Sequence, residues 1–93
     1  MTRIVKMSFH PHTIDSFLQL FEERKSIIRN FPGCTHLALL KDINDPLQYF
    51  TYSIWENEEA LNNYRQSDFF VETWGTTKKL FAGKPEAWSV EEI

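Results

Sequence analysis

The 93-residue sequence contains a single cysteine, Cys34, which excludes an intramolecular disulfide and a zinc site built from several cysteines. Glycine and proline are also scarce, with three and four copies, and no stretch rich in them marks a linker. No apolar run approaches the ~20 residues that a membrane-spanning helix needs. Ten basic residues against thirteen acidic ones leave no positive excess typical of nucleic-acid-binding domains. We therefore expect one soluble, cytoplasmic domain over residues 1–93 that binds neither nucleic acid nor a membrane.

Aromatic residues, by contrast, are abundant. The chain has eight Phe, three Tyr and three Trp, a large apolar content for so small a domain. Eight of these residues lie between Tyr49 and Trp74. Such a concentration can form one hydrophobic core or the walls of one ligand pocket, and the sequence leaves both open.

Four segments carry the residues that favour strands, and turn residues or proline flank them. These predicted strands span residues 3–9, 34–41, 47–55 and 86–91. The segment 42–46 between the middle two is short and rich in turn-forming residues. The second and third strands are therefore expected to pair as an antiparallel hairpin.

Two helical regions occupy the rest of the sequence. Apolar residues with a period near 3.6 follow Thr13, a candidate N-cap, and continue to Pro32. Asn57 and Ser67 are further candidate N-caps, so the second region is expected to bend near Ser67. The order strand, helix, strand, strand, helix, strand predicts a ferredoxin-like α+β fold, in which helices cover one face of a four-stranded antiparallel sheet.

Both faces of the predicted sheet are apolar. In the third strand, Phe50, Tyr52 and Ile54 lie on one side, and Tyr49 and Trp55 lie on the other. An antiparallel sheet with one face in water should instead alternate apolar and polar residues. We expect the face away from the helices to be covered by a second subunit in a two-fold homodimer. The alternative is a monomer with scattered exposed apolar residues, which is common.

Two runs of sequence resemble the antibiotic biosynthesis monooxygenase (ABM) domain. Residues 50–61 read Phe-Thr-Tyr-Ser-Ile-Trp-Glu-Asn-Glu-Glu-Ala-Leu, and residues 64–70 read Tyr-Arg-Gln-Ser-Asp-Phe-Phe. In that family a strand likewise ends in Trp-Glu, an acidic helix start carries Ala-Leu, and a Ser-x-x-Phe step follows. The segments 32–34, 45–46 and 84–88 are similar to it as well.

This resemblance implies both an assembly and a chemistry. The assembly is a dimeric α+β barrel, in which the sheets of two ferredoxin-like subunits pack together. The chemistry is that of a small monooxygenase that oxidises an aromatic or quinol-like small molecule with O₂ and needs no bound cofactor. A second branch of the family degrades haem.

Oxygenation without a cofactor places clear demands on a protein. The substrate anion must donate electrons to O₂, so the protein must remove a proton, stabilise an oxyanion and exclude water. We predict His36 as the general base, because histidine is the side chain whose unperturbed pKa lies nearest neutrality, and Tyr64 as a donor. Strand alternation places His36 on the side of Cys34 and Ala38. The residues expected to contact substrate are Tyr52, Trp55, Arg65 and Trp74.

Each of these residues also has a structural interpretation, either as a core aromatic or as a surface polar group. His10 and His12 have no third ligand nearby in the sequence, so no metal site is predicted. Trp74 stands where the haem-degrading branch has its iron-ligating histidine, and an indole nitrogen only donates. The alternatives are a non-enzymatic dimeric domain for small-molecule binding or stress response, and a haem-binding relative that lacks the usual haem-degrading residues.

Overall fold

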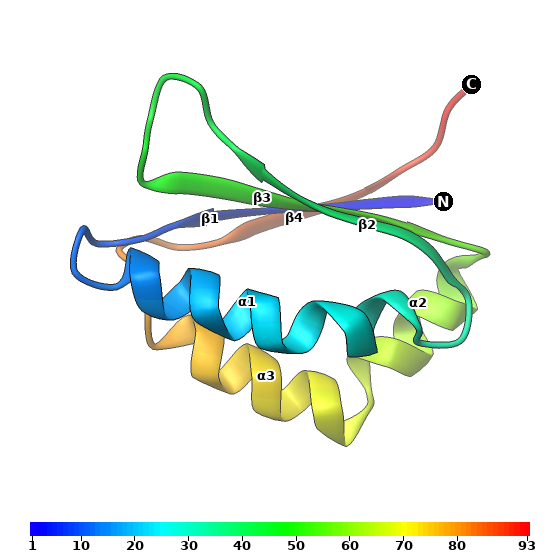
Figure 1. Cartoon of the computed structure of the whole chain (residues 1–93). Coiled ribbons are helices and arrows are strands. Elements are labelled where there is room, and N and C mark those ends of the chain that lie inside the picture. The colour runs from blue at the N-terminus through cyan, green and yellow to red at the C-terminus, as the bar shows by residue number, and fades with distance from the viewer.

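The computed structural model describes all 93 residues and confirms the predicted α+β fold. A four-stranded sheet forms one layer, and three helices pack beneath it (Figure 1). No helix is both long and apolar enough to cross a bilayer. In chain order the elements are β1 (Thr2–Ser8), α1 (Ile14–Arg29), β2 (Cys34–Lys41), β3 (Gln48–Trp55), α2 (Glu58–Arg65), α3 (Asp68–Lys78) and β4 (Glu86–Val90).

The strands pair antiparallel in the order β2-β3-β1-β4. β1 and β3 are therefore the central strands, and the predicted hairpin of β2 with β3 is confirmed. Ile4 on β1 lies opposite Tyr52 on β3 and opposite Trp88 on β4. All three helices lie on one side of the sheet, which leaves the other side uncovered in the single chain (Figure 1).

Two of the three predicted N-caps make the expected hydrogen bond. The Asn57 side chain accepts from the backbone N–H of Ala60 (2.8 Å), and the Ser67 hydroxyl accepts from that of Phe70 (3.1 Å). Ser67 thus begins a separate helix, α3, where a bend was expected. Thr13 makes no cap hydrogen bond with α1; its hydroxyl instead donates to the carbonyl oxygen of Leu80 (2.8 Å), beyond the end of α3.

Gly33 joins α1 to β2 at a point of close approach. Its φ angle is +87°, in the left-handed region that favours glycine. A Cβ atom there would lie 2.4 Å from the Cβ of Ala60 on α2. The missing side chain therefore lets the start of β2 pack directly against α2.

The core between sheet and helices consists of two separate clusters of buried side chains. One contains Met7, Phe9, Phe17 and Tyr49, and the other contains Cys34, Trp55, Leu61 and Tyr64. The first cluster lies at the end of β1 and the start of β3, whereas the second lies at the end of β3 and the start of β2. Neither cluster covers the middle of the sheet, which lies between them.

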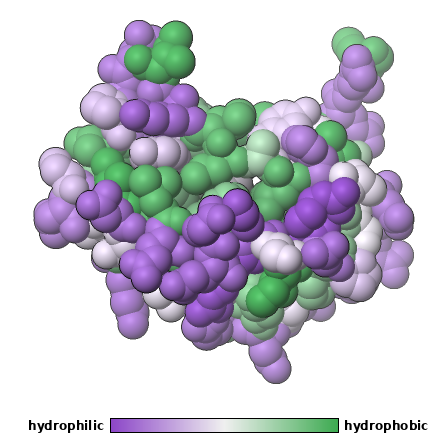
Figure 2. Space-filling view, in the orientation of Figure 1, coloured by the Kyte–Doolittle hydropathy of each residue, from purple (hydrophilic) through white to green (hydrophobic).

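The far face of the sheet is apolar, as predicted. Leu40, Trp88 and Val90 on this face are 45 %, 42 % and 43 % exposed, and Phe50 and Tyr52 are half-buried. Apolar side chains gather along the sheet layer, above the polar surface of the helices (Figure 2). An edge-to-face contact joins the His36 and Tyr52 rings there, with centroids 5.8 Å apart.

His36 does not lie on the side of Cys34, as alternation predicts, because a β-bulge interrupts the start of β2. Cys34 pairs with Trp55 and His36 pairs with Ile54, so one extra residue, Thr35, lies between two neighbouring partners. Cys34 is consequently buried in the core with Trp55, whereas His36 is exposed on the far face. Simple alternation could not predict this, because a bulge changes the side to which the following residues point.

Candidate functional site

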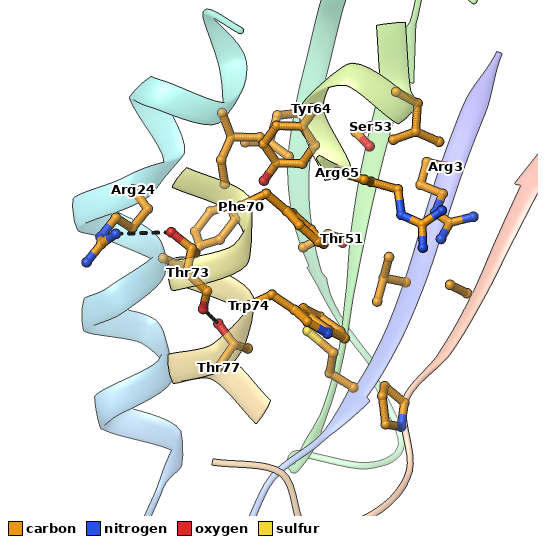
Figure 3. Close-up of a pocket in the computed structure, with 18 of the residues that line it drawn as sticks. Arg3, Arg24, Thr51, Ser53, Tyr64, Arg65, Phe70, Thr73, Trp74 and Thr77 are labelled. Carbon is orange, nitrogen blue, oxygen red and sulfur yellow. Dashed lines mark hydrogen bonds between the residues drawn. The ribbon is translucent and has the colours of Figure 1, made fainter. Parts of the chain in front are cut away.

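A cavity of about 440 Å³ lies between the sheet and the helices, in the region that separates the two core clusters (Figure 3). Both clusters contribute to its lining, through Met7 and Phe17 on one side and Trp55 and Tyr64 on the other. Thirteen of its 22 lining residues are hydrophobic. Its volume lies within the roughly 300–1,000 Å³ typical of pockets for small molecules.

Stacked aromatic rings form one wall of the cavity. Phe70 and Trp74, one turn apart on α3, have ring planes only 9° apart and centroids separated by 6.0 Å. Tyr64 makes an edge contact with Phe70 and stacks on Trp55, both at 5.1 Å between centroids. The Trp55 indole N–H donates to the Ser53 hydroxyl (3.0 Å), so this buried pair is satisfied internally. These contacts hold the aromatic wall in a defined position.

Tyr64 brings a polar group to this wall. Its side chain is buried. The Ser67 hydroxyl and backbone N–H both donate to the backbone carbonyl of Tyr64, whereas the Tyr64 hydroxyl has no hydrogen-bond partner in the protein. Burial raises the pKa of Tyr64 far above its ordinary value, and nearby Cys34 raises it further. At neutral pH the side chain is therefore a protonated phenol. It can donate a hydrogen bond to a ligand oxygen but cannot act as a base.

Two arginines from different elements also line the cavity. Arg3 lies on the central strand β1, Arg65 lies at the end of α2, and the two side chains converge (Figure 3). Arg3 donates to the Ser89 hydroxyl (3.0 Å), and neither arginine takes part in any of the three ion pairs of the structure. Desolvation lowers the pKa of Arg3, and the positive charge of Arg65 lowers it further.

The other charged residues of the lining are already paired. Arg24 on α1 forms an ion pair with Glu72 on α3, and it donates to the Thr73 hydroxyl (3.0 Å). Glu86 is the one acidic residue of the lining, and its carboxylate lies 3.6 Å from the ammonium group of Lys6. Arg3 and Arg65 are therefore the free cations of the site.

The structure brings together four of the six residues singled out from the sequence. Trp55, Tyr64, Arg65 and Trp74 all line the cavity. Tyr52 does not, because alternation along β3 directs Thr51 and Ser53 toward the helices.

His36 is outside the cavity as well, since it shares the far face of the sheet with Tyr52. No histidine lines the cavity, so the predicted general base, His36, does not lie beside it. The His10 and His12 rings stack on each other at 5.1 Å, and no group of three or more potential metal-ligating side chains occurs in the chain.

Arg3 is the site residue that the sequence analysis missed. It precedes Val5, Met7 and Phe9 at alternate positions on the face of β1 that points to the helices. A cation that begins an otherwise apolar alternate series is a detectable signal, because an arginine on the core side of a strand needs a partner or a ligand.

The family model for antibiotic biosynthesis monooxygenases matches residues 1–74 of the chain. No curated protein matches the sequence.

Solved structures share the fold over almost the whole chain. An antibiotic biosynthesis monooxygenase superposes with a TM-score of 0.89 at 19 % identity, covering 100 % of this chain and 99 % of its own. A Mycobacterium tuberculosis protein gives 0.90 at 13 % identity, covering 99 % and 93 %. A conserved protein from Methanosarcina mazei gives 0.86 at 20 % identity, covering 92 % and 86 %. At these identities the structural likeness shows the fold alone.

Proposed function

The chain belongs to the antibiotic biosynthesis monooxygenase family, and from this premise we propose that it is a cofactor-independent monooxygenase. Its substrate is an aromatic, quinol-like small molecule, and its second substrate is O₂. The observation that carries the proposal is the unpartnered Tyr64 hydroxyl at the aromatic wall of the cavity of about 440 Å³. An apolar site with a few converging polar groups is the typical form of a small-molecule site.

The proposed reaction replaces a ring CH₂ of the substrate by C=O. One oxygen atom of O₂ enters the substrate, and the other leaves as water with the two hydrogens removed. The substrate must first lose a proton, because its enolate or phenolate is the electron donor to O₂. In an apolar cavity that anion forms readily only where a donor is already directed at the developing charge.

Tyr64 is the proposed donor to this oxyanion. Its raised pKa keeps the proton on the phenol, so the hydroxyl donates to the substrate oxygen through the reaction. Phe70 and Trp74 hold the rings of the substrate, and Trp55 holds Tyr64. The proposed acceptor of the substrate proton is water at the exposed side of the cavity, beside Arg65, and the protein's part is to stabilise the anion.

A homodimer formed through the far face of the sheet is part of the proposal. Leu40, Trp88 and Val90 give this face an exposed apolar surface that a second copy of the chain can cover. We place the protein in the cytoplasm, since its one cysteine is a free thiol, as proteins of reducing compartments usually have.

The test is oxygen consumption by the purified protein with a panel of anthrones and hydroquinones, with and without added flavin. The proposal expects uptake without flavin and, from the anthrones, which carry the reacting ring CH₂, a quinone product with one atom of labelled oxygen from ¹⁸O₂. Uptake that requires flavin would contradict it. Tight binding of the panel with no uptake would favour the non-enzymatic binding domain.

A further inference from the structure

Arg3 and Arg65 lie together without a counter-charge. They come from elements far apart in the sequence, β1 and α2, yet their guanidinium groups converge at the cavity (Figure 3). No acidic side chain lies within 4.0 Å of either group, since the three ion pairs of the structure involve other residues. Arg24, in the same lining, is by contrast paired with Glu72.

Such an arrangement is unfavourable in the empty protein. Like charges repel, and partial burial of Arg3 removes part of its hydration. Both effects lower the pKa of Arg3. Ser89 holds one of the Arg3 nitrogens by a hydrogen bond of 3.0 Å, which fixes the side chain but supplies no negative charge. The site therefore lacks an anion.

We propose that Arg3 and Arg65 together bind a carboxylate of the ligand, whose aromatic body occupies the cavity. A guanidinium group presents a planar fork of N–H donors that matches the two oxygens of a carboxylate. A single phenolate oxygen would satisfy few of the donors that two arginines offer. Arg65 is exposed, so a permanent charge would remain near solvent while the reacting ring lies among the aromatic residues. Tyr64 is then left to serve the ring oxygen.

The inference rests on the proposed function for the aromatic nature of the ligand, but its test needs no turnover. Isothermal titration calorimetry of the dimer or monomer, as purified, compares anthracene-2-carboxylate with its neutral primary amide, which has nearly the same shape. We expect the acid to bind wild type at least about tenfold more tightly than the amide, as charge-assisted hydrogen bonds provide. The difference should shrink in high salt.

Variants assign this preference to the two arginines. Arg3→Gln and Arg65→Gln should each weaken binding of the acid by roughly tenfold and leave the amide within about twofold. Lys78→Gln is the matched control, because it removes the same charge from an exposed residue on α3 outside the lining. Arg65 is exposed at a helix end, so its variant is expected to fold even where Arg3→Gln destabilises the sheet.

Three results would overturn the inference: no preference for the acid in wild type, an equal loss for both probes in Arg65→Gln, or an equal loss of acid binding in Lys78→Gln. Failure of the proposed function looks different. An arginine-dependent preference for the acid with no oxygen uptake from any substrate would refute the oxygenase and support the carboxylate site. Oxygen uptake that Arg65→Gln leaves unchanged for acidic and neutral substrates alike would refute the carboxylate site alone.

Discussion

Tyr64 stacks on Trp55, with 5.1 Å between ring centroids and 28° between ring planes. This contact joins α2 to the last residue of β3, and it places a buried phenol at the cavity wall. Trp55 itself is 1 % exposed and is anchored by its hydrogen bond to Ser53. Trp55 therefore fixes the position of the Tyr64 ring, and Tyr64 presents its hydroxyl to the cavity.

The first prediction concerns that hydroxyl. Tyr64→Phe keeps the ring and its stacking but removes the donor, so we expect the rate of oxygen uptake to fall by about 10²-fold. The free energy of unfolding should change by no more than about 1 kcal/mol, since the hydroxyl has no partner in the protein. Tyr49→Phe is the control, because Tyr49 is equally buried but does not line the cavity. Equal rates for Tyr64→Phe and wild type would remove Tyr64 from the mechanism.

The second prediction concerns His36. Its side chain lies on the far face of the sheet from the cavity, in contact with Tyr52. His36→Ala should therefore keep oxygen uptake within about twofold of wild type, as expected for an exposed residue away from the site. Initial rates should be measured at concentrations where sedimentation shows an unchanged assembly. A loss of tenfold or more with that assembly intact would restore His36 as a functional residue.

The third prediction concerns Trp55. Replacement by alanine empties a large fully buried site and leaves the Ser53 hydroxyl without its donor. We expect a loss of about 3–5 kcal/mol in the free energy of unfolding, typical of a buried Trp→Ala change. Urea unfolding followed by circular dichroism measures this loss. A loss below about 1 kcal/mol would mean that the indole is not the anchor that the structure shows.

The fourth prediction concerns assembly. The wild-type protein should sediment at twice the chain mass of 11.1 kDa at micromolar concentration. Trp88→Glu places a charge in the cross-strand row of Tyr52, Ile4 and Trp88 and should shift the equilibrium to monomer. Val71→Glu is the control, since Val71 is 62 % exposed on α3, away from the sheet. A wild-type monomer, or equal dissociation by both variants, would contradict the proposed interface.

The fifth prediction concerns alkaline pH. Burial raises the pKa of Tyr64 above 10.0 and that of Cys34 above 9.0, the ordinary values of these groups. Above about pH 9 the unfolded chain therefore binds fewer protons than the folded chain, so the free energy of unfolding falls as the pH rises. Denaturant unfolding between pH 7 and 11 should show this fall, and a Tyr64→Phe, Cys34→Ser double variant should flatten it. An identical slope in wild type and double variant would place the effect elsewhere.

Local chemistry was sufficient to predict most of the fold from the sequence. Strand-favouring residues between turn residues predict β2 with its observed bounds, and Asn57 and Ser67 mark the starts of two helices through cap hydrogen bonds. The Thr13 hydroxyl could not be assigned this way, because its partner, Leu80, is 67 residues away.

The site was less predictable because it depends on register and on the side to which each residue points. A bulge beside Thr35 separates Cys34 from His36, and no residue type in that segment marks it. The alternate series Arg3, Val5, Met7 marks Arg3 as unusual, but only strand pairing places it between Ser53 and Ser89 in the middle of the sheet. Such long-range neighbours are fixed only when the strands assemble.

The gap between the two core clusters has a thermodynamic consequence. A ligand that fills the cavity touches Met7 and Phe17 on one side and Trp55 and Tyr64 on the other, so it joins two small hydrophobic units into one. Folded and unfolded chains then differ in ligand affinity, and every bound compound raises the melting temperature in proportion to the logarithm of its concentration over Kd. At equal concentration the rise in melting temperature therefore reports the affinity of each compound, so a library of aromatic acids can be ranked by thermal unfolding before any reaction is known.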